Sequence, residues 1–404
     1  MQISKYTFFV SFFLSSCLNF NSLAADSEVK IGGAVEVQAV YYSSDGDDTQ
    51  KKLSTYNKEY GFSSSGNFFL DHKLVADSGL KYGAKIGAEI TARNNRSAPL
   101  IMYVESDFGK IEAGSGKSAM DIMKITGYTA SCATGNGWDA FAIISPKDGK
   151  DKKVAYVTNF CNFLDAKSRT PGETEFPRKI SYFTPKFGSD EHKFQIGVSY
   201  IPDTSNIGYE SAAKGNLSDL ADSPAYKFAI TDGIGYGMSY EGKFSESLSA
   251  KLSFVGEIGK PLAFDKDDES KKADVKFKSL NTYNVGSEVT YDKTSVAASY
   301  MNYNQSLTNS EIDKLGHNTN IYSLGAKYAF SDDVSVSLNH FYSEHKKNKV
   351  NASSVGGDYF VASGIKTYAQ LTHYKAEGKF IENDLTKKDK STGTVVILGM
   401  KVSL

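Results

Sequence analysis

The chain has few residues of the kinds that mark several common protein classes. Its 404 residues include three cysteines and six histidines, and the formal net charge is -1. The near-neutral charge argues against nucleic-acid binding, which needs a basic surface. The histidines are scattered and none stands in a recognisable nucleophile motif, so we do not expect an enzyme. We expect no metal or cofactor, because no histidine lies near the two central cysteines to complete a tetrahedral set.

Long hydrophobic runs are also rare. The mean hydropathy is -0.36 and 23% of residues are charged, which is too polar for a bundle of membrane helices. One apolar stretch stands at the N-terminus, where Lys5 precedes an apolar run over 6–14 and a small-residue cleavage site ending at Ala24 or Ala25. We therefore expect residues 1–25 to be a signal peptide that is removed on export.

A second interpretation of this stretch remains open. The residues Leu14-Ser15-Ser16-Cys17 resemble a lipoprotein processing site, at which Cys17 would be lipidated and kept. Ordinary cleavage after Ala24 or Ala25 is the simpler interpretation, because a strand pattern follows at once.

Aromatic residues and glycine are abundant, with 25 Tyr, 25 Phe and 35 Gly. In 29–42, Val29, Ile31 and Val35 share one face of a strand, while Lys30 and Glu36 share the other. Apolar residues at every second position, for roughly ten residues at a time, give each strand one apolar and one polar face. This pattern predicts an all-β, transmembrane antiparallel β-barrel of about sixteen strands. The expected strands are 29–42, 67–76, 80–93, 100–106, 110–115, 178–184, 193–200, 234–243, 248–257, 282–291, 295–303, 321–330, 334–343, 354–362, 365–374 and 394–404.

The connections between these strands have two lengths. Tight turns are expected at 77–79, 107–109, 185–191, 245–247, 292–293, 331–333 and 363–364, in strict alternation with longer polar segments. Short periplasmic turns and long outer loops are typical of outer-membrane barrels. No composition break or helical period indicates a second domain, so residues 26–404 are expected to form one barrel.

The last strand, 394–404, has an apolar residue at nearly every second position. An uncovered apolar edge strand would invite aggregation in a soluble protein, whereas a barrel closes that edge against its first strand. A soluble propeller or sandwich is the alternative fold, but it needs neither this edge nor the apolar band and the export signal together.

One connection, 117–177, is roughly four times as long as an ordinary loop. The lumen of a barrel of about sixteen strands is wide enough to hold a folded loop, so we expect 117–177 to lie in the lumen as a constriction loop. Within it, Asp121 and Asp139 are our candidates for carboxylates at the aperture.

Basic residues on the second and third strands are the candidates for the opposite wall. Their parity places them opposite the apolar band, and a Lys or Arg turned to lipid at mid-depth would cost about 2 to 4 kcal/mol. They are therefore expected to face the lumen, where a field between them and the loop carboxylates would favour polar solutes. These residues are Lys73, Lys81, Lys85 and Arg93.

Several motifs resemble those of one family. The hairpin 104–114, with Asp107-Phe108-Gly109, resembles the one before the constriction loop of general diffusion porins of Gram-negative bacteria. The pair 178–188 and 194–203 is similar to the strands that follow that loop, particularly in alphaproteobacterial porins. The resemblance implies a homotrimer of sixteen-stranded barrels that passes ions and small hydrophilic solutes. The wall here is mostly Lys where the family has Arg, and Leu404 stands where it typically has Phe.

Cys132 and Cys161 are expected to form a disulfide that clips the loop. In an oxidising compartment, closing a loop of about thirty residues would stabilise the chain by about 3 kcal/mol in the chain-entropy model. The alternative is two free thiols.

The sequence therefore predicts an outer-membrane porin, with outer-membrane lipid, its own copies, ions and small hydrophilic solutes as partners. The alternatives are a substrate-selective channel and a surface adhesin. The polar segments 42–48 and 202–232 are long enough to bind a partner. A selective channel would be expected to carry an aromatic track or a ring of one charge.

Overall fold

The computed structural model describes residues 24–44, 59–91, 95–130, 157, 160, 162–165, 176–205, 226–265, 272, 274–309, 318–382 and 385–404. The predicted signal peptide lies almost entirely outside these residues and stays a prediction. The described chain is almost all strand. Its strands are β1 (Ala24–Ser44), β2 (Tyr60–Ala76), β3 (Lys81–Thr91), β4 (Asn95–Ser106), β5 (Gly109–Ser115), β6 (Arg178–Phe183), β7 (Phe187–Gly188), β8 (His192–Asp203), β9 (Tyr226–Lys243), β10 (Leu248–Asp265), β11 (Leu280–Tyr291), β12 (Thr294–Asn304), β13 (Thr319–Ala329), β14 (Val334–His345), β15 (Asn348–Ala362), β16 (Ile365–Glu382) and β17 (Leu385–Ser403).

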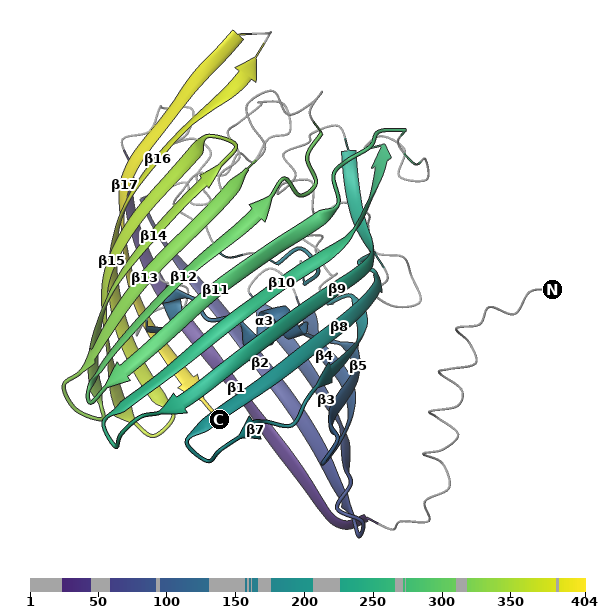
Figure 1. Ribbon diagram of the computed structural model, residues 1–404. Coiled ribbons are helices and arrows are strands. Elements are labelled where there is room, and N and C mark those ends of the chain that lie inside the picture. Colours follow the sequence, from purple (N-terminus) through teal and green to yellow (C-terminus); the bar gives the residue numbers. More distant parts are fainter. Residues whose placement is uncertain are drawn as a thin grey trace.

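These strands form one closed antiparallel barrel (Figure 1). Each strand pairs with its neighbours in the sequence, and β1 pairs with both β2 and β17. The two short strands β6 and β7 both pair with β8, so together they make one interrupted barrel strand. The seventeen segments therefore make sixteen barrel strands, which confirms the predicted fold.

The predicted closing strand is confirmed. β17 pairs with β1 from Ala34 opposite Ser403 to Ser44 opposite Gly393. Its outward residues Leu398 and Met400 are 55% and 48% exposed, whereas the inward Ile397 is fully buried. The apolar face seen in the sequence therefore points away from the lumen.

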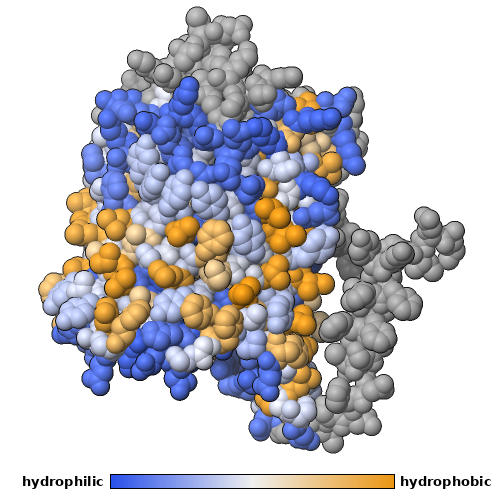
Figure 2. All heavy atoms as spheres, in the orientation of Figure 1, coloured by the Kyte–Doolittle hydropathy of each residue, from blue (hydrophilic) through white to orange (hydrophobic). Residues whose placement is uncertain are grey.

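The outward face of the described wall exposes many apolar side chains, whereas the inward face carries both polar side chains and buried apolar ones such as Ile321 and Phe341. On β14 exposed and buried residues alternate, with Val336 and Leu338 outward and Ser337 and Asn339 inward. Figure 2 shows apolar residues gathered across the middle of the face in view, between hydrophilic upper and lower zones. Such a belt on the outside of a closed barrel fits a hydrocarbon surrounding.

The predicted tight turns are confirmed, but their strict alternation with longer segments is wrong. β14 and β15 are joined by Lys346 and Lys347 alone, and β16 and β17 by residues 383–384. Lys346 and Lys347 both have positive φ, 50° and 72°, as a two-residue hairpin turn requires. The hairpin of β16 and β17 continues well above the rest of the barrel (Figure 1). The sequence predicts loops here because the outward residues of these extensions are polar, as at Lys349, Asn351 and Lys375.

Within the described residues, helix occurs only at the start of segment 117–177. α3 (Ala119–Met123) and the 3-10 turn η1 (Gly127–Ala130) follow β5 directly. In the described part of the chain, no helix has the length and apolar character to cross a membrane.

Candidate functional site: the barrel interior

The described start of segment 117–177 lies against the inner face of the barrel wall. α3 contacts β6, β8, β9 and β10, and η1 contacts β11 to β14. Two inward glycines allow this approach. A Cβ on Gly286 would lie 2.2 Å from the carbonyl oxygen of Ile125, and one on Gly325 would lie 2.0 Å from that of Gly127. The loop backbone therefore rests directly on the wall backbone, where only glycine fits.

Inward serine hydroxyls on the same strands accept hydrogen bonds from the loop backbone. A backbone N–H removed from water and left unpaired would destabilise the fold, and these serines supply the partners. Ala119 N donates to Ser199 Oγ at 2.8 Å, Ile125 N to Ser253 Oγ at 3.1 Å, and Gly127 N to Ser323 Oγ at 2.7 Å. We call Gly286, Gly325, Ser199, Ser253 and Ser323 the loop seat.

Asp165 joins the two ends of the segment. Its carboxylate accepts the backbone N–H of Ser118 at 3.0 and 3.1 Å and the Ser118 hydroxyl at 2.5 Å. It also forms an ion pair with Lys179 of β6, and both side chains are nearly fully buried. The segment therefore leaves and returns to the wall at one fixed point.

Asp121 lies on α3 within a small charged cluster. Lys117 Nζ and Lys124 Nζ lie 3.0 and 3.2 Å from its carboxylate, and Asn162 Nδ2 donates to it at 3.0 Å. Burial acts to raise the pKa of Asp121, but the two ammonium groups outweigh it and hold this pKa below its ordinary value. Asp121 is thus paired rather than free. We call Lys117, Asp121 and Lys124 the loop edge, which carries two positive charges and one negative. The Lys117 side chain is 60% exposed.

The apolar part of the segment also packs on the wall. Phe160 lies edge-on to Tyr128 at 5.8 Å and to Phe341 of β14 at 6.0 Å between ring centroids. Ser343 Oγ donates to the carbonyl oxygen of Val157 at 2.5 Å. The returning limb is therefore held by both packing and hydrogen bonds.

The other side of the interior carries the predicted basic residues. Lys73, Lys81 and Lys85 lie on the inward parity of β2 and β3, opposite exposed outward residues such as Ile86. Each lysine lies opposite a carboxylate on the adjacent strand, so positive and negative side chains alternate across this part of the wall. The pairs are Lys73 opposite Glu28, Lys85 opposite Asp71, and Lys81 with Glu105 at 3.3 Å.

Four predicted site residues lie outside the described side chains. They are Asp139, Arg93, Cys132 and Cys161, so the second aperture carboxylate, the fourth basic residue and the disulfide stay predictions.

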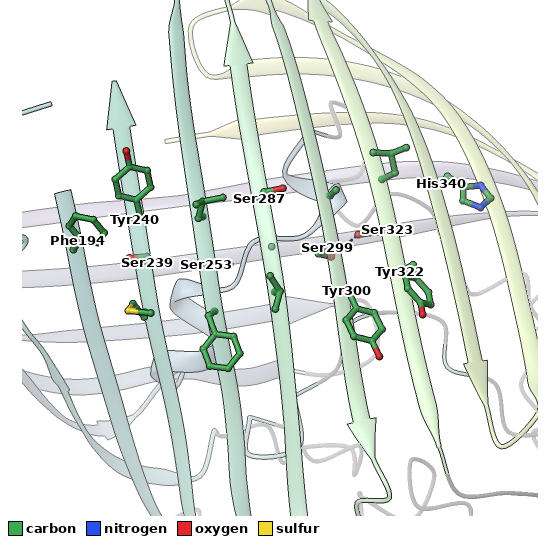
Figure 3. A pocket seen from close by; sticks show the side chains of 17 residues that line it. Phe194, Ser239, Tyr240, Ser253, Ser287, Ser299, Tyr300, Tyr322, Ser323 and His340 are labelled. Carbon is green, nitrogen blue, oxygen red and sulfur yellow. Dashed lines mark hydrogen bonds between the residues drawn. The ribbon is translucent and has the colours of Figure 1, made fainter. Parts of the chain in front are cut away.

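An apolar depression of about 960 Å³ lies on the outward face of β8 to β14 (Figure 3). Its lining includes the outward side chains Met238, Leu252, Val285 and Leu324. A row of rings with centroids 4.9 to 6.5 Å apart crosses the same face, and rows of this kind mark the interfaces of membrane barrels. The depression therefore belongs to the lipid-facing surface and not to the interior. The row comprises Tyr236, Phe254, Tyr283, Tyr300, Tyr322 and Tyr342.

Three outward histidines lie beside a hydroxyl of the neighbouring strand. His340 Nδ1 lies 2.9 Å from Ser353 Oγ at the edge of the depression. His72 and His373 are similarly placed beside Ser27 and Thr394. Each ring therefore has a local polar partner, as an interfacial histidine requires.

The comparisons with known proteins agree with this architecture. The family model described as Gram-negative porin matches residues 21–379. An uncharacterized protein of Rickettsia prowazekii (strain Madrid E) is 28% identical, with 97% of this chain and 98% of the relative covered. One of Rickettsia typhi is 29% identical, with 94% and 93% covered.

Two solved structures are similar in fold. The anion-selective porin from Comamonas acidovorans superposes with a TM-score of 0.57 at 16% identity, covering 94% of this chain and all of that chain. OmpT, an outer-membrane protein of Vibrio cholerae, gives a TM-score of 0.54 at 12% identity, covering 94% and 99%.

Proposed function

The chain belongs to the Gram-negative porin family and forms an outer-membrane channel, and we propose that segment 117–177 narrows this channel to a passage for ions and small hydrophilic solutes. The observation that carries the proposal is the loop seat. Loop backbone rests on Gly286 and Gly325 inside the barrel, and inward serine hydroxyls accept its hydrogen bonds. Family and fold are those of channels rather than enzymes.

We propose that the passage discriminates weakly between ions, with a small preference for anions. The lysines of β2 and β3 face carboxylates, so their fields largely cancel. The cluster of Lys117, Asp121 and Lys124 leaves one unbalanced positive charge at the loop edge. The structural neighbour from Comamonas acidovorans is anion-selective, which accords with this sign.

We also propose a homotrimer held in outer-membrane lipid. The apolar outward belt supplies the surface for both lipid and subunit contacts. OmpT of Vibrio cholerae, similar in fold, was solved in a trimer form.

The disulfide between Cys132 and Cys161 belongs to this proposal. Mass spectrometry of the protein digested without reductant should find the two cysteines in one linked peptide pair. Alkylation of both thiols in the unreduced protein would exclude the disulfide.

Planar-bilayer recording of the purified protein tests the channel. We expect steady conductance that closes in three steps, a small reversal potential of anion sign in a salt gradient, and entry of graded neutral solutes up to a size limit. Absence of conductance would refute the channel, and saturable block by one sugar or anion would favour a substrate-selective channel instead.

A further inference from the structure

We propose that Glu257 of β10 is a positioning residue of the aperture, because its carboxylate anchors the returning limb of segment 117–177 to the wall. This inference rests on the proposal that the segment narrows the channel. It assigns a role to one fully buried carboxylate of the barrel wall.

The geometry of Glu257 is that of an anchor. Its Oε1 accepts the backbone N–H of Phe163 at 2.7 Å, and its Oε2 accepts that of Leu164 at 2.9 Å. Thr282 Oγ1 of β11 donates to Oε1 at 3.2 Å, which fixes the side chain from the wall. Two consecutive amides therefore meet two carboxylate oxygens, an arrangement that only a carboxylate of this length completes.

Within the described residues, no lysine or arginine forms an ion pair with Glu257, although its side chain is fully buried. A carboxylate in that position is costly unless hydrogen bonds replace its water. The donors are the loop amides and Thr282, so the carboxylate and the limb stabilise each other. Packing completes the contact, since Leu164 is fully buried against Gly233 and Phe163 lies 5.0 Å from the Tyr303 ring.

The anchored limb connects directly to the charged cluster of the loop edge. Asn162 precedes Phe163, and its side chain donates to Asp121 at 3.0 Å and accepts from Lys124 at 2.9 Å. Lys124 also donates to the carbonyl oxygen of Phe160 at 3.1 Å. Release of the limb from Glu257 would therefore withdraw three contacts from the cluster that carries the unbalanced charge.

Two substitutions of Glu257 separate its role as an anchor from the effect of its charge on passing ions, one that keeps the shape and one that keeps the charge. Glu257→Gln keeps the shape but turns an amide donor toward one of the two loop N–H groups. Glu257→Asp keeps the charge but is one methylene too short to reach both. Glu288→Gln is the matched control, because Glu288 is an inward carboxylate on the adjacent β11 that pairs with Lys251 at 2.9 Å and touches no described loop residue.

The experiment uses the full-length protein in detergent and in planar bilayers. Hydrogen exchange of the peptide covering Phe163 and Leu164 reports the anchor, and single-channel conductance with reversal potential reports the aperture. Because a hydrogen bond to a buried charge favours the bound state by about tenfold or more, we expect at least about tenfold faster exchange in both Glu257 variants. Both should also show larger conductance fluctuations and a shifted reversal potential.

The outcomes distinguish the possibilities. Wild-type exchange rates in the two Glu257 variants, or unchanged conductance and reversal potential, would overturn the anchor. A reversal potential that shifts equally in Glu257→Gln and Glu288→Gln, but not in Glu257→Asp, would assign Glu257 the role of a lumenal charge only. If Glu257→Gln does not assemble, Glu257→Asp carries the test. A wild-type protein without conductance would refute the channel proposal, while the exchange measurement would still decide the anchor.

Discussion

Reversing the charge of Lys117 should reverse the ion preference of the channel. Lys117 is exposed at the loop edge, 3.0 Å from Asp121. An ion that passes about 6 Å from a unit charge in water has an interaction energy with it of about 0.7 kcal/mol, which 0.1 M salt reduces to about 0.4 kcal/mol. Lys117→Glu changes the charge by two units, so each ion shifts by about 0.8 kcal/mol, in opposite directions for cations and anions. The cation-to-anion permeability ratio should rise about tenfold at 0.1 M salt and only about twofold at 1 M.

The reversal potential across a salt gradient measures this ratio, and the control is an equal change of charge on the outside of the barrel. Lys260 of β10 is exposed and pairs with Asp232 at 2.9 Å. Lys260→Glu should therefore leave the ratio unchanged. A ratio that does not move in Lys117→Glu at 0.1 M, or that moves equally at both salt concentrations, would refute the placement of Lys117 at the aperture.

Three further predictions concern the loop and its seat. Since the pKa of Asp121 is lowered below 3.8, the stabilisation from its ion pairs should be complete above that pH and lost only as the pH falls further. Channel conductance should therefore stay constant down to about pH 4 and change below it. Asp121→Asn should lack this change of conductance at low pH. Gly325→Val should unseat η1, seen as faster proteolysis of the loop, whereas Gly357→Ala, with its nearest atom at 3.4 Å, should not. Lys347→Gly should increase the free energy of unfolding by up to about 1 kcal/mol, because the φ of 72° at this position suits glycine. The unfolding midpoint should rise accordingly, and a lower midpoint would contradict this.

The barrel could be predicted because lipid imposes a pattern on every spanning strand. Apolar residues at alternate positions identified all sixteen barrel strands, and the parity of 394–404 gave the closing pair with β1. The boundaries were less accurate where strands leave the apolar belt. β9 begins at Tyr226 rather than 234, and β2 at Tyr60 rather than 67, because beyond the belt both faces meet water and the alternation fades.

The interior was predicted less fully, because its contacts join residues far apart in the chain. Parity shows that Gly325 faces inward, but not that Gly127 rests on it. The pairing of Asp121 was the interior contact that the sequence could have predicted. Lys117 stands four residues before Asp121 and Lys124 three residues after it, which is the spacing of one helical turn. That inference required α3 to be recognised inside a segment whose length suggested only a loop.

Two parts of the described wall make different contacts with the lumen. The strands β8, β10, β11 and β13 contribute the loop seat, where glycine and serine positions are fixed by backbone contact. The strands β1 to β4 contribute paired charges, such as Lys81 with Glu105, that touch no described loop residue. A substitution on β1 to β4 therefore alters the field that a solute meets without moving the loop, whereas a substitution in the seat moves the loop itself. Charge selectivity should consequently be easier to change than pore size in this protein.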